Sequence, residues 1–525
     1  IQNFTIGTYC NRKQQIIVMS ISGANKYTVY ASENRGRVLL LFLLFLTAIY
    51  LFYTSGFNGF MMICAIPAAA LYTIIAFRYK MFTFWTLLVV NYFVMFLNRY
   101  QYMPIPPSLP NEMLEIILIA IAIIDTKLVL SSRFANAMSV ALLIWCGFCV
   151  IEMFNDTCGL GYNIGAWYTG ARLMAFQLLY AFIVCTIYIS SPEKIMGFVR
   201  VWACLSIFAA FWAWKQKYIG FTDIEKAWLV YAGRTHLVNG IIRYFSVFSD
   251  AANFGCNMAA SSIVFYVIAI TNKIKKERIF FLIAALACTW AMFSSGTRTA
   301  IFCFIAGTMV YIVLSKSIKI ACYVGVLFAL FVFFLAFTTI GNGNDMIRRM
   351  RSAFNRNDAS VNVRDINKAA ISKYMQDAPW GIGIGMGYEN VPANNKYRKL
   401  STIPPDSEYV FIWVHTGPIG ISLFVLTTII MVFGASWIVF FRLKNRSLQG
   451  IGAGICGAFV AIQLGAYANQ ILMQFPNVLI FYGSLAIVYV MPHIEEHYIE
   501  YENNRLNEQE KRRQEKLARK KAFRP

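Results

Sequence analysis

Three arginines in the second half of the chain stand beside apolar runs, where a permanent positive charge is costly. Arg243 lies in RYFSVFSDAANFG, and Arg298 lies in SSGTRTA between two apolar runs. Arg364 lies in VNVRDINKAAISKYMQD, four residues before Lys368. A guanidinium presents a planar fork of donors that matches two phosphate oxygens. These residues therefore indicate binding of an anion.

Each of these basic side chains also has a structural explanation. Arg243 could contact Asp250, and Lys368 could pair with Asp365 on a helix that lies on the membrane surface. Arg364 and Lys368 are like charges at i and i+4, which costs an isolated helix about 0.2–0.5 kcal/mol. A bound anion would offset that cost, so anion binding and internal pairing are the two alternatives.

A second polar group precedes another apolar run, in PPDSEYVFIWVHTGPIG at residues 404–420. Asp406, Glu408 and His415 are the candidates there for a general base that accepts a proton from a hydroxyl. Asp is also a favoured residue at helix N-caps, so a cap is the alternative role of Asp406.

Glycines alternate with larger residues in PWGIGIGMGYEN, residues 379–390. The segment lacks the GK[ST] ending of a phosphate-binding loop, so a nucleotide site is not indicated. We expect a glycine-rich turn packed close to a helix end. The chain also lacks the ligand spacing of a zinc site, and we expect neither a metal nor another cofactor.

The elements that must position these residues are membrane helices. Of the 525 residues, 58% are hydrophobic and only 14% are charged, a balance typical of polytopic membrane proteins. Runs of about 17–25 apolar residues can cross a bilayer as helices. The sequence thus predicts an all-α polytopic membrane protein with about 12–14 transmembrane helices. The candidate spans lie near 38–55, 58–77, 81–98, 111–124, 136–154, 169–190, 195–214, 254–272, 279–295, 299–315, 320–339, 417–441, 450–470 and 473–491.

Basic residues are distributed in the pattern that sets membrane topology. Short basic connections such as NKIKKER (272–278) and FRLKNR (441–446) share one side with the basic tail. By the positive-inside rule both termini are cytoplasmic. We expect a cytoplasmic arm at 1–37, a transmembrane domain at 38–491 and a basic cytoplasmic tail at 492–525. External loops at 215–253 and 340–416, the latter with short helices, then carry the candidate site. The net charge of +22 is accordingly topogenic and indicates no nucleic-acid partner.

The order of four motifs over about 240–425 resembles the O-antigen ligase/polymerase superfamily of bacterial membrane proteins. The motifs are RYFSVFSDAANFG, SSGTRTAI, VRDINKAAISKYMQDAPWGIGIGMG and DSEYVFIWVHTGPIGI. The resemblance implies a GT-C-type glycosyltransferase that takes a glycan from undecaprenyl diphosphate and passes it to a hydroxyl. The arginines of the family thought to hold the donor diphosphate correspond to Arg243, Arg298 and Arg364. Where ligases usually carry a His, often followed by Asn, this chain has Asp406 and Ser407.

That departure favours a polymerase of O-antigen, capsule or exopolysaccharide, independent of metal and ATP. An O-antigen ligase acting on lipid A-core is one alternative, and a non-enzymatic transporter of lipid-linked sugar or a small anion is another. Transporters usually contain inverted repeats, and the sequence has no such symmetry. The expected partners are undecaprenyl-diphosphate-linked glycan, a glycan or lipid A-core acceptor, membrane lipids and other polysaccharide-assembly proteins. The expected location is the bacterial inner membrane, with the active site on the periplasmic face.

Overall fold

The computed structural model describes residues 35–100, 106–125, 131–238, 241–343, 345–351, 359–385 and 391–522. The chain forms two compact units, Ile1–Tyr79 and Lys80–Pro525. The described part of the first unit is helix α2, Arg35–Arg78, which contains Pro67. The two spans expected at 38–55 and 58–77 are therefore parts of one continuous helix.

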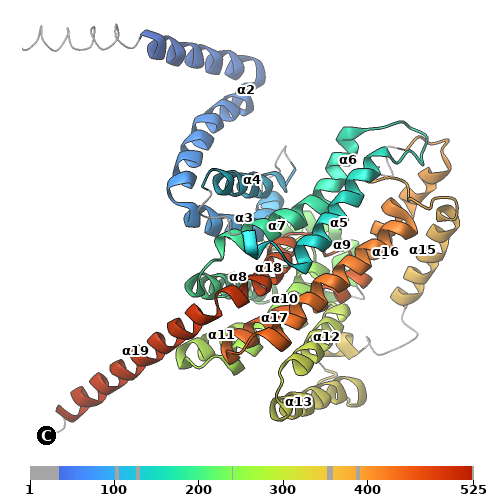
Figure 1. The fold of residues 1–525 in the computed structure, drawn as a ribbon. Helices are drawn as coiled ribbons and strands as arrows, with labels where there is room; N and C mark the ends of the chain where they lie inside the picture. Colours follow the sequence, from blue (N-terminus) through green and yellow to red (C-terminus); the bar gives the residue numbers. More distant parts are fainter. Residues whose placement is uncertain are drawn as a thin grey trace, which may run out of the picture. The chain divides into compact units, whose positions relative to one another are not determined.

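The second unit is built almost entirely of helices (Figure 1). The first half contains α3 (Lys80–Tyr100), α4 (Leu109–Ile124), η2 (Ser131–Arg133), α5 (Ala137–Ile151), η3 (Glu152–Phe154), α6 (Ile164–Ala171), η4 (Arg172–Phe176), α7 (Gln177–Tyr188), α8 (Pro192–Tyr218), α9 (Asp223–His236), β1 (Leu237–Val238), β2 (Ile241–Ile242) and α10 (Ala251–Thr271). The second half contains α11 (Lys275–Ser294), α12 (Arg298–Leu314), α13 (Ile318–Phe337), α14 (Asp345–Arg351), α15 (Ala359–Met375), η7 (Lys396–Thr402), α16 (Glu408–Trp437), η8 (Ile438–Arg442), α17 (Arg446–Ala468), η9 (Val478–Tyr482), α18 (Gly483–Val490), η10 (Met491–His493) and α19 (Glu495–Ala522). The short strands β1 and β2 pair antiparallel, with Leu237 opposite Ile242.

Among the described residues, eight helices are long and apolar enough to cross a membrane. The number rises to nine if the bent pair Val478–His493 and Glu495–Glu515 forms one span. This confirms the all-α polytopic class. The count is below the expected 12–14 partly because α4 contains only 16 residues, and because the apolar stretches Phe45–Thr54, Arg298–Leu314 and Ala321–Phe337 are shorter than the length required.

Helix α10 lies at the centre of the second unit and packs against α8, α11, α12 and α17. Close helix contacts depend on small residues, as is common in membrane bundles. A Cβ added to Gly307 of α12 would lie 2.6 Å from the Gly457 carbonyl oxygen of α17. No side chain fits at that distance. This contact fixes the position of α12, which begins with Arg298.

The two ends of α10 define two ends of the bundle. At its start, the Asp250 carboxylate accepts hydrogen bonds from the amides of Ala252 and Asn253. Beyond its end, Lys273 forms an ion pair with Glu502 of α19 at 2.8 Å. A helix of 21 residues is about 30 Å long. The basic connection at 272–278 and the tail helix therefore lie at one end, and the Arg243 loop lies at the other.

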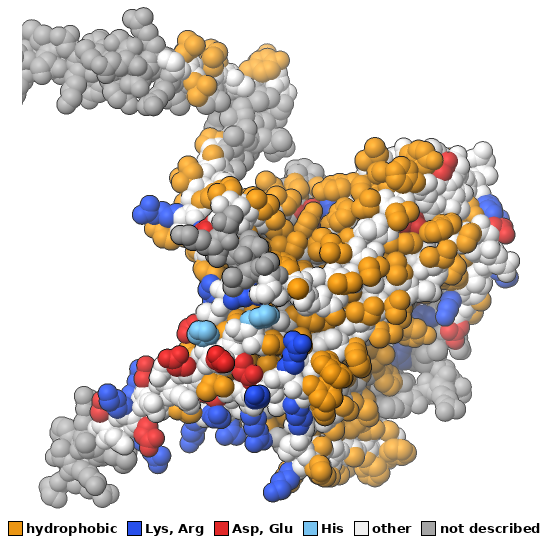
Figure 2. Space-filling model, viewed as in Figure 1, with side chains coloured by type: hydrophobic (Ala, Val, Ile, Leu, Met, Phe, Trp, Pro, Cys, Tyr) orange, Lys and Arg blue, Asp and Glu red, His pale blue; other side chains and the backbone are white. Residues whose placement is uncertain are grey.

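Apolar side chains cover a broad surface over α5 and α16 (Figure 2). Leu143 and Ile144 on α5, with Ile429 and Phe433 on α16, are all exposed. Along α19 this surface gives way to charged side chains, drawn blue and red in Figure 2. An exposed apolar surface of this extent is typical of contact with lipid.

A helical segment begins at Pro418, next to the expected start at 417. Gly417, with φ 67° and ψ −175°, is not helical and separates this segment from a preceding one that begins at Glu408. A Gly-Pro pair is typical of such a break. The two segments together form α16, and His415 lies in the first of them.

Candidate functional site

A cavity of about 500 Å³ opens between α15, the start of α16 and the end of α17. Its walls bring together three residues predicted from the sequence: Arg364, Lys368 and Asp406. The remaining lining residues are Asp365, Pro405, Ser407, Tyr409, Val410, Trp413, Ile421, Tyr467 and Ala468. The cavity thus combines two cations, two carboxylates and an aromatic wall.

Helix α15 supplies the cations. Its second half anchors it to the protein through Ile371 and Met375, which are buried in a cluster with α16 and η7. Val363 and Ile366, in the first half of α15, are 52% and 66% exposed. Only the second half of the helix therefore packs against the protein. No ion pair of the described residues joins Asp365 to Lys368, so that structural alternative is not supported.

Asp406 lies just before the start of α16, and its carboxylate contacts α15. The side-chain amide of Asn367 donates a hydrogen bond to Asp406 Oδ2 at 2.8 Å. Asp406 has a left-handed backbone, with φ 54°, which Asp tolerates better than most residues. The N-cap of α16 is Ser407. Asp406 is therefore not the helix cap, and its carboxylate lines the cavity.

Glu408 does not line the cavity. Its side chain is only 4% exposed, and its carboxylate accepts a hydrogen bond from the Leu472 amide at 3.1 Å. The contact anchors the connection that follows α17 to the start of α16. The structure supports a packing role for Glu408 and places it away from the cavity lining.

His415 is also buried and does not line the cavity. Its Nδ1 lies 2.8 Å from the Phe411 carbonyl oxygen, and its own carbonyl accepts from the Gly383 amide at 3.1 Å. His415 thus belongs to the contact between the glycine-rich turn and α16. Of the three candidate bases, only Asp406 lies in the cavity wall.

The glycine-rich turn packs against the backbone of α16 where its first helical segment ends, at Gly417, as expected. A Cβ added to Gly381 would lie 2.4 Å from the His415 carbonyl carbon. Gly381 also has a positive φ of 76°, a conformation that other residues rarely adopt. Only glycine therefore allows this approach of the two backbones.

A separate arginine cluster surrounds the hairpin between α11 and α12. Arg243 donates from Nη2 to Thr297 Oγ1 at 2.9 Å, and Arg349 donates from Nε to the Gly296 carbonyl at 2.7 Å. Arg298 is the first residue of α12. Burial, with repulsion from the Arg349 guanidinium next, lowers the pKa of Arg243 to about 10. Three arginines are thus gathered around one hairpin.

The cluster lies at the N-terminus of α12. The first turn of α12 contains no acidic residue, and a helix N-terminus favours negative charge. The Asp250 carboxylate, considered as a partner of Arg243, caps α10 and also favours the charged form of Arg243, which raises its pKa against the effect of burial.

The arginine cluster and the cavity lie at the same end of the bundle. The connection after α17 contacts both regions, since the Leu472 amide bonds Glu408 and Asn477 bonds Asn253. Asn253 lies in the first turn of α10, next to the loop that carries Arg243.

Two residues of these sites, Asn367 and Arg349, were not predicted from the sequence. Asn367 is at i+3 from Arg364, so helical spacing could have placed it beside the cavity. Arg349 stands among other basic residues in IRRMR, and no spacing distinguishes it from Arg348 or Arg351. Its partner, Gly296, is 53 residues away in the chain.

Neither cluster contains a set of metal ligands. Within the described residues, no group of three or more His, Cys, Asp or Glu side chains could hold a metal ion. The ten cysteines whose side chains the structure describes are free.

Comparison with known proteins identifies one family. Residues 281–425 match the family model Wzy_C, described as O-antigen ligase. The matched segment contains Arg298, Arg364, Lys368 and Asp406, and Arg243 lies before it. The match confirms the resemblance noted in the sequence. No curated protein matches the chain.

Proposed function

We propose that this member of the O-antigen ligase/polymerase superfamily transfers a glycan from undecaprenyl diphosphate to a hydroxyl acceptor. The observation that carries the proposal is the cavity in which Arg364 and Lys368 stand beside the Asp406 carboxylate. Cations suit a diphosphate leaving group, and a carboxylate suits an incoming hydroxyl. One cavity therefore offers complementary groups for both partners of a glycosyl transfer.

The reaction assigns a task to each group. The bond between the anomeric carbon of the donor sugar and its phosphate oxygen breaks, and the acceptor oxygen bonds to that carbon. Arg364 and Lys368 stabilise the negative charge that develops on the leaving diphosphate. Asp406 accepts the proton of the acceptor hydroxyl. Asn367 orients the Asp406 carboxylate through its hydrogen bond at 2.8 Å.

The arginine cluster of Arg243, Arg298 and Arg349 completes the donor-binding surface. Its location at the same end of the bundle as the cavity, and the three guanidinium groups that it gathers, support a second set of contacts to the anionic donor. Two aromatic residues of the cavity, Tyr409 and Trp413, offer apolar surface beside the cations. Such surface suits the ring faces of a glycan.

The acceptor class follows from the residues at 406–407. Asp406 and Ser407 replace the His, often followed by Asn, of ligases, which favours a polymerase acting on a second lipid-linked repeat unit. An O-antigen ligase that uses lipid A-core is the alternative. Both place the enzyme in the inner membrane with cytoplasmic termini and a periplasmic active site, in agreement with the distribution of basic loops.

Asp406→Asn tests the proposal. We would purify the full chain, add a synthetic undecaprenyl-diphosphate-linked repeat unit and follow polymer formation on gels. Asparagine keeps the shape and tolerates the left-handed backbone, but it cannot accept a proton. We expect loss of polymer by about 100-fold or more, the range of general base catalysis.

The matched control is Asp377→Asn. Asp377 forms an exposed ion pair with Lys396 at 3.0 Å and lies outside the cavity. Normal polymer from this variant and loss from Asp406→Asn would support the general base. Normal polymer formation by both variants would exclude Asp406 as the general base. Transport of the donor across vesicle membranes without polymer formation would favour the transporter alternative.

A further inference from the structure

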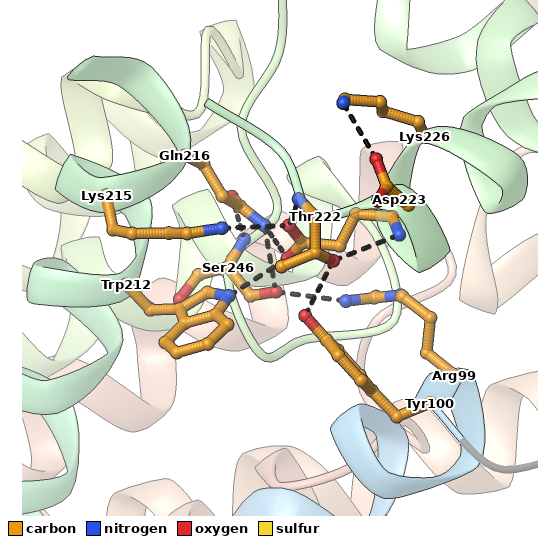
Figure 3. A network of polar contacts seen from close by, with 10 residues as sticks. Arg99, Tyr100, Trp212, Lys215, Gln216, Thr222, Asp223, Lys226 and Ser246 are labelled. Atoms are coloured by element: carbon orange, nitrogen blue, oxygen red, sulfur yellow. Dashed lines mark hydrogen bonds and ion pairs between the residues drawn. The ribbon is translucent and has the colours of Figure 1, made fainter. Parts of the chain in front are cut away.

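The loop that carries Arg243 has an irregular backbone that must be held in place. It runs from β2 to α10 and includes Ser246 in a left-handed conformation, with φ 51°. The Arg243 amide donates to the His236 carbonyl at 2.8 Å, which fixes the start of the loop. The rest of the loop is held by a buried polar network (Figure 3).

Arg99, at the end of α3, forms hydrogen bonds to the loop from one side. Its Nη1 donates to the Ser246 carbonyl at 3.0 Å, and its Nη2 donates to the Phe248 carbonyl. The guanidinium carbon lies 4.5 Å from the Trp228 ring centre and 4.4 Å from the Phe245 ring centre. A planar fork of donors that also stacks on aromatic rings is a property of arginine that lysine lacks.

Gln216, on α8, holds the other side of the same residue. The Ser246 amide donates to Gln216 Oε1 at 2.9 Å, and the Ser246 hydroxyl donates to the Ala209 carbonyl at 2.6 Å. Gln216 in turn donates from Nε2 to Glu225 Oε1 at 2.7 Å. Ser246 is thus held through its amide, its carbonyl and its side chain.

Glu225 is the centre of the network. It forms a capping box with Thr222, in which the Thr222 amide donates to Oε2 at 2.8 Å and the Glu225 amide donates to Thr222 Oγ1 at 3.2 Å. Trp212 also donates to Oε1 at 3.0 Å. Burial raises the pKa of Glu225, but hydrogen bonds from Thr222, Trp212 and Gln216 outweigh it and hold the pKa below its ordinary value. The carboxylate therefore stays charged and orients Gln216.

We infer that Arg99 and Glu225 are positioning residues for Arg243. They fix the loop on both sides of Ser246, three residues after Arg243, and so set where its guanidinium meets the hairpin at Thr297. The inference rests on the proposed role of Arg243 in binding the diphosphate. Neither Arg99 nor Glu225 lines the cavity between α15 and α16.

The test combines pyrophosphate binding with backbone protection. Inorganic pyrophosphate is titrated into the purified full chain in lipid nanodiscs, and amide hydrogen exchange is measured over residues 244–250. We expect Arg243→Ala and Arg99→Gln each to weaken pyrophosphate binding by about tenfold. The double variant should bind no more than about twofold more weakly than either, because Arg99 acts through Arg243. Glu225→Gln should weaken binding in the same direction.

Lys226→Gln is the matched control. Lys226 pairs with Asp223 at 2.9 Å in the exposed part of the same network (Figure 3) and makes no contact to the loop there. We expect wild-type pyrophosphate binding and wild-type exchange over 244–250 for this variant. Arg99→Gln should increase exchange over the same residues. If Arg99→Gln does not fold, Arg99→Lys replaces it, with one donor kept and an intermediate loss expected.

The outcomes separate this inference from the proposed function. Weaker binding by Arg243→Ala with normal binding by Arg99→Gln would overturn the inference alone. Losses that multiply in the double variant would show that Arg99 acts independently of Arg243, and would also overturn it. If Arg243→Ala leaves binding unchanged, the diphosphate role of Arg243 fails. In that case faster exchange over 244–250 in Arg99→Gln still supports positioning of the loop, and unchanged exchange refutes it.

Discussion

Replacement of Arg364 by alanine removes one of the two cations in the cavity wall. Arg364 is half-buried on α15 and lines the cavity with Lys368, one helical turn further along. The two cations repel each other at i and i+4. The variant should lose activity, and removal of this repulsion favours its helix by about 0.2–0.5 kcal/mol.

The size of the loss follows from the contact that disappears. A hydrogen bond to a charged group contributes about 1.5–3 kcal/mol, or roughly 10- to 150-fold in rate if it is made in the transition state. Because Arg364 is only half-buried and Lys368 remains beside it, we expect the lower end, about tenfold. Arg364→Lys should recover part of the loss, since it keeps the charge and loses the planar fork. Replacement of both Arg364 and Lys368 should reduce activity more than replacement of either residue alone.

The assay measures polymer chain length on gels together with the amount of protein in membranes. Lys373→Ala is the matched control, because Lys373 is exposed on the same helix and does not line the cavity. It removes the same charge from α15. Normal polymer from Arg364→Ala, an equal loss from Lys373→Ala, or a loss that only follows protein level would refute the diphosphate role of Arg364.

Three further predictions concern the turn, the cofactors and the topology. Gly381→Ala should lower the thermal unfolding temperature, because its Cβ would lie 2.4 Å from the His415 carbonyl carbon at a residue with a positive φ. Gly147→Ala is the control, because the space around its new Cβ is open. Equal unfolding temperatures for the two variants would contradict the argument. Purified protein should make polymer with EDTA and without nucleotide, since the site offers cations for the diphosphate; loss with EDTA that Mg²⁺ restores would count against the arginines. A single cysteine at position 358, outside the described residues, should react with an impermeant label in intact spheroplasts while the tail at 511–524 is protected. The reverse pattern would overturn the topology.

The class of the protein and the helical placement of its basic pair follow from local sequence alone. Apolar runs of membrane length can be satisfied only as helices, because backbone polar groups find no partners in lipid. Arg364 and Lys368 share a face because they are four residues apart within one helix, α15. The order of the motifs likewise identified the family that residues 281–425 match.

The choice among Asp406, Glu408 and His415 required the tertiary structure. All three lie within ten residues of one another and are chemically able to act as bases. Asp406 lies in the cavity wall and accepts a hydrogen bond from Asn367, which is 39 residues away in the chain. Glu408 lies in the interior and accepts a hydrogen bond from the Leu472 amide, which is 64 residues away. His415 contacts Phe411 and the glycine-rich turn.

The same reason explains the contact at Gly417 and the arginine cluster. The pair Gly417-Pro418 locally favours a break between helical segments, but tertiary packing brings Gly381 against that break. Arg349 joins the cluster because it bonds the Gly296 carbonyl, and Arg243 joins it because Arg99 and Gln216 hold its loop. Residue spacing determines which side chains share a helical face, but contacts between distant parts of the chain determine what that face meets.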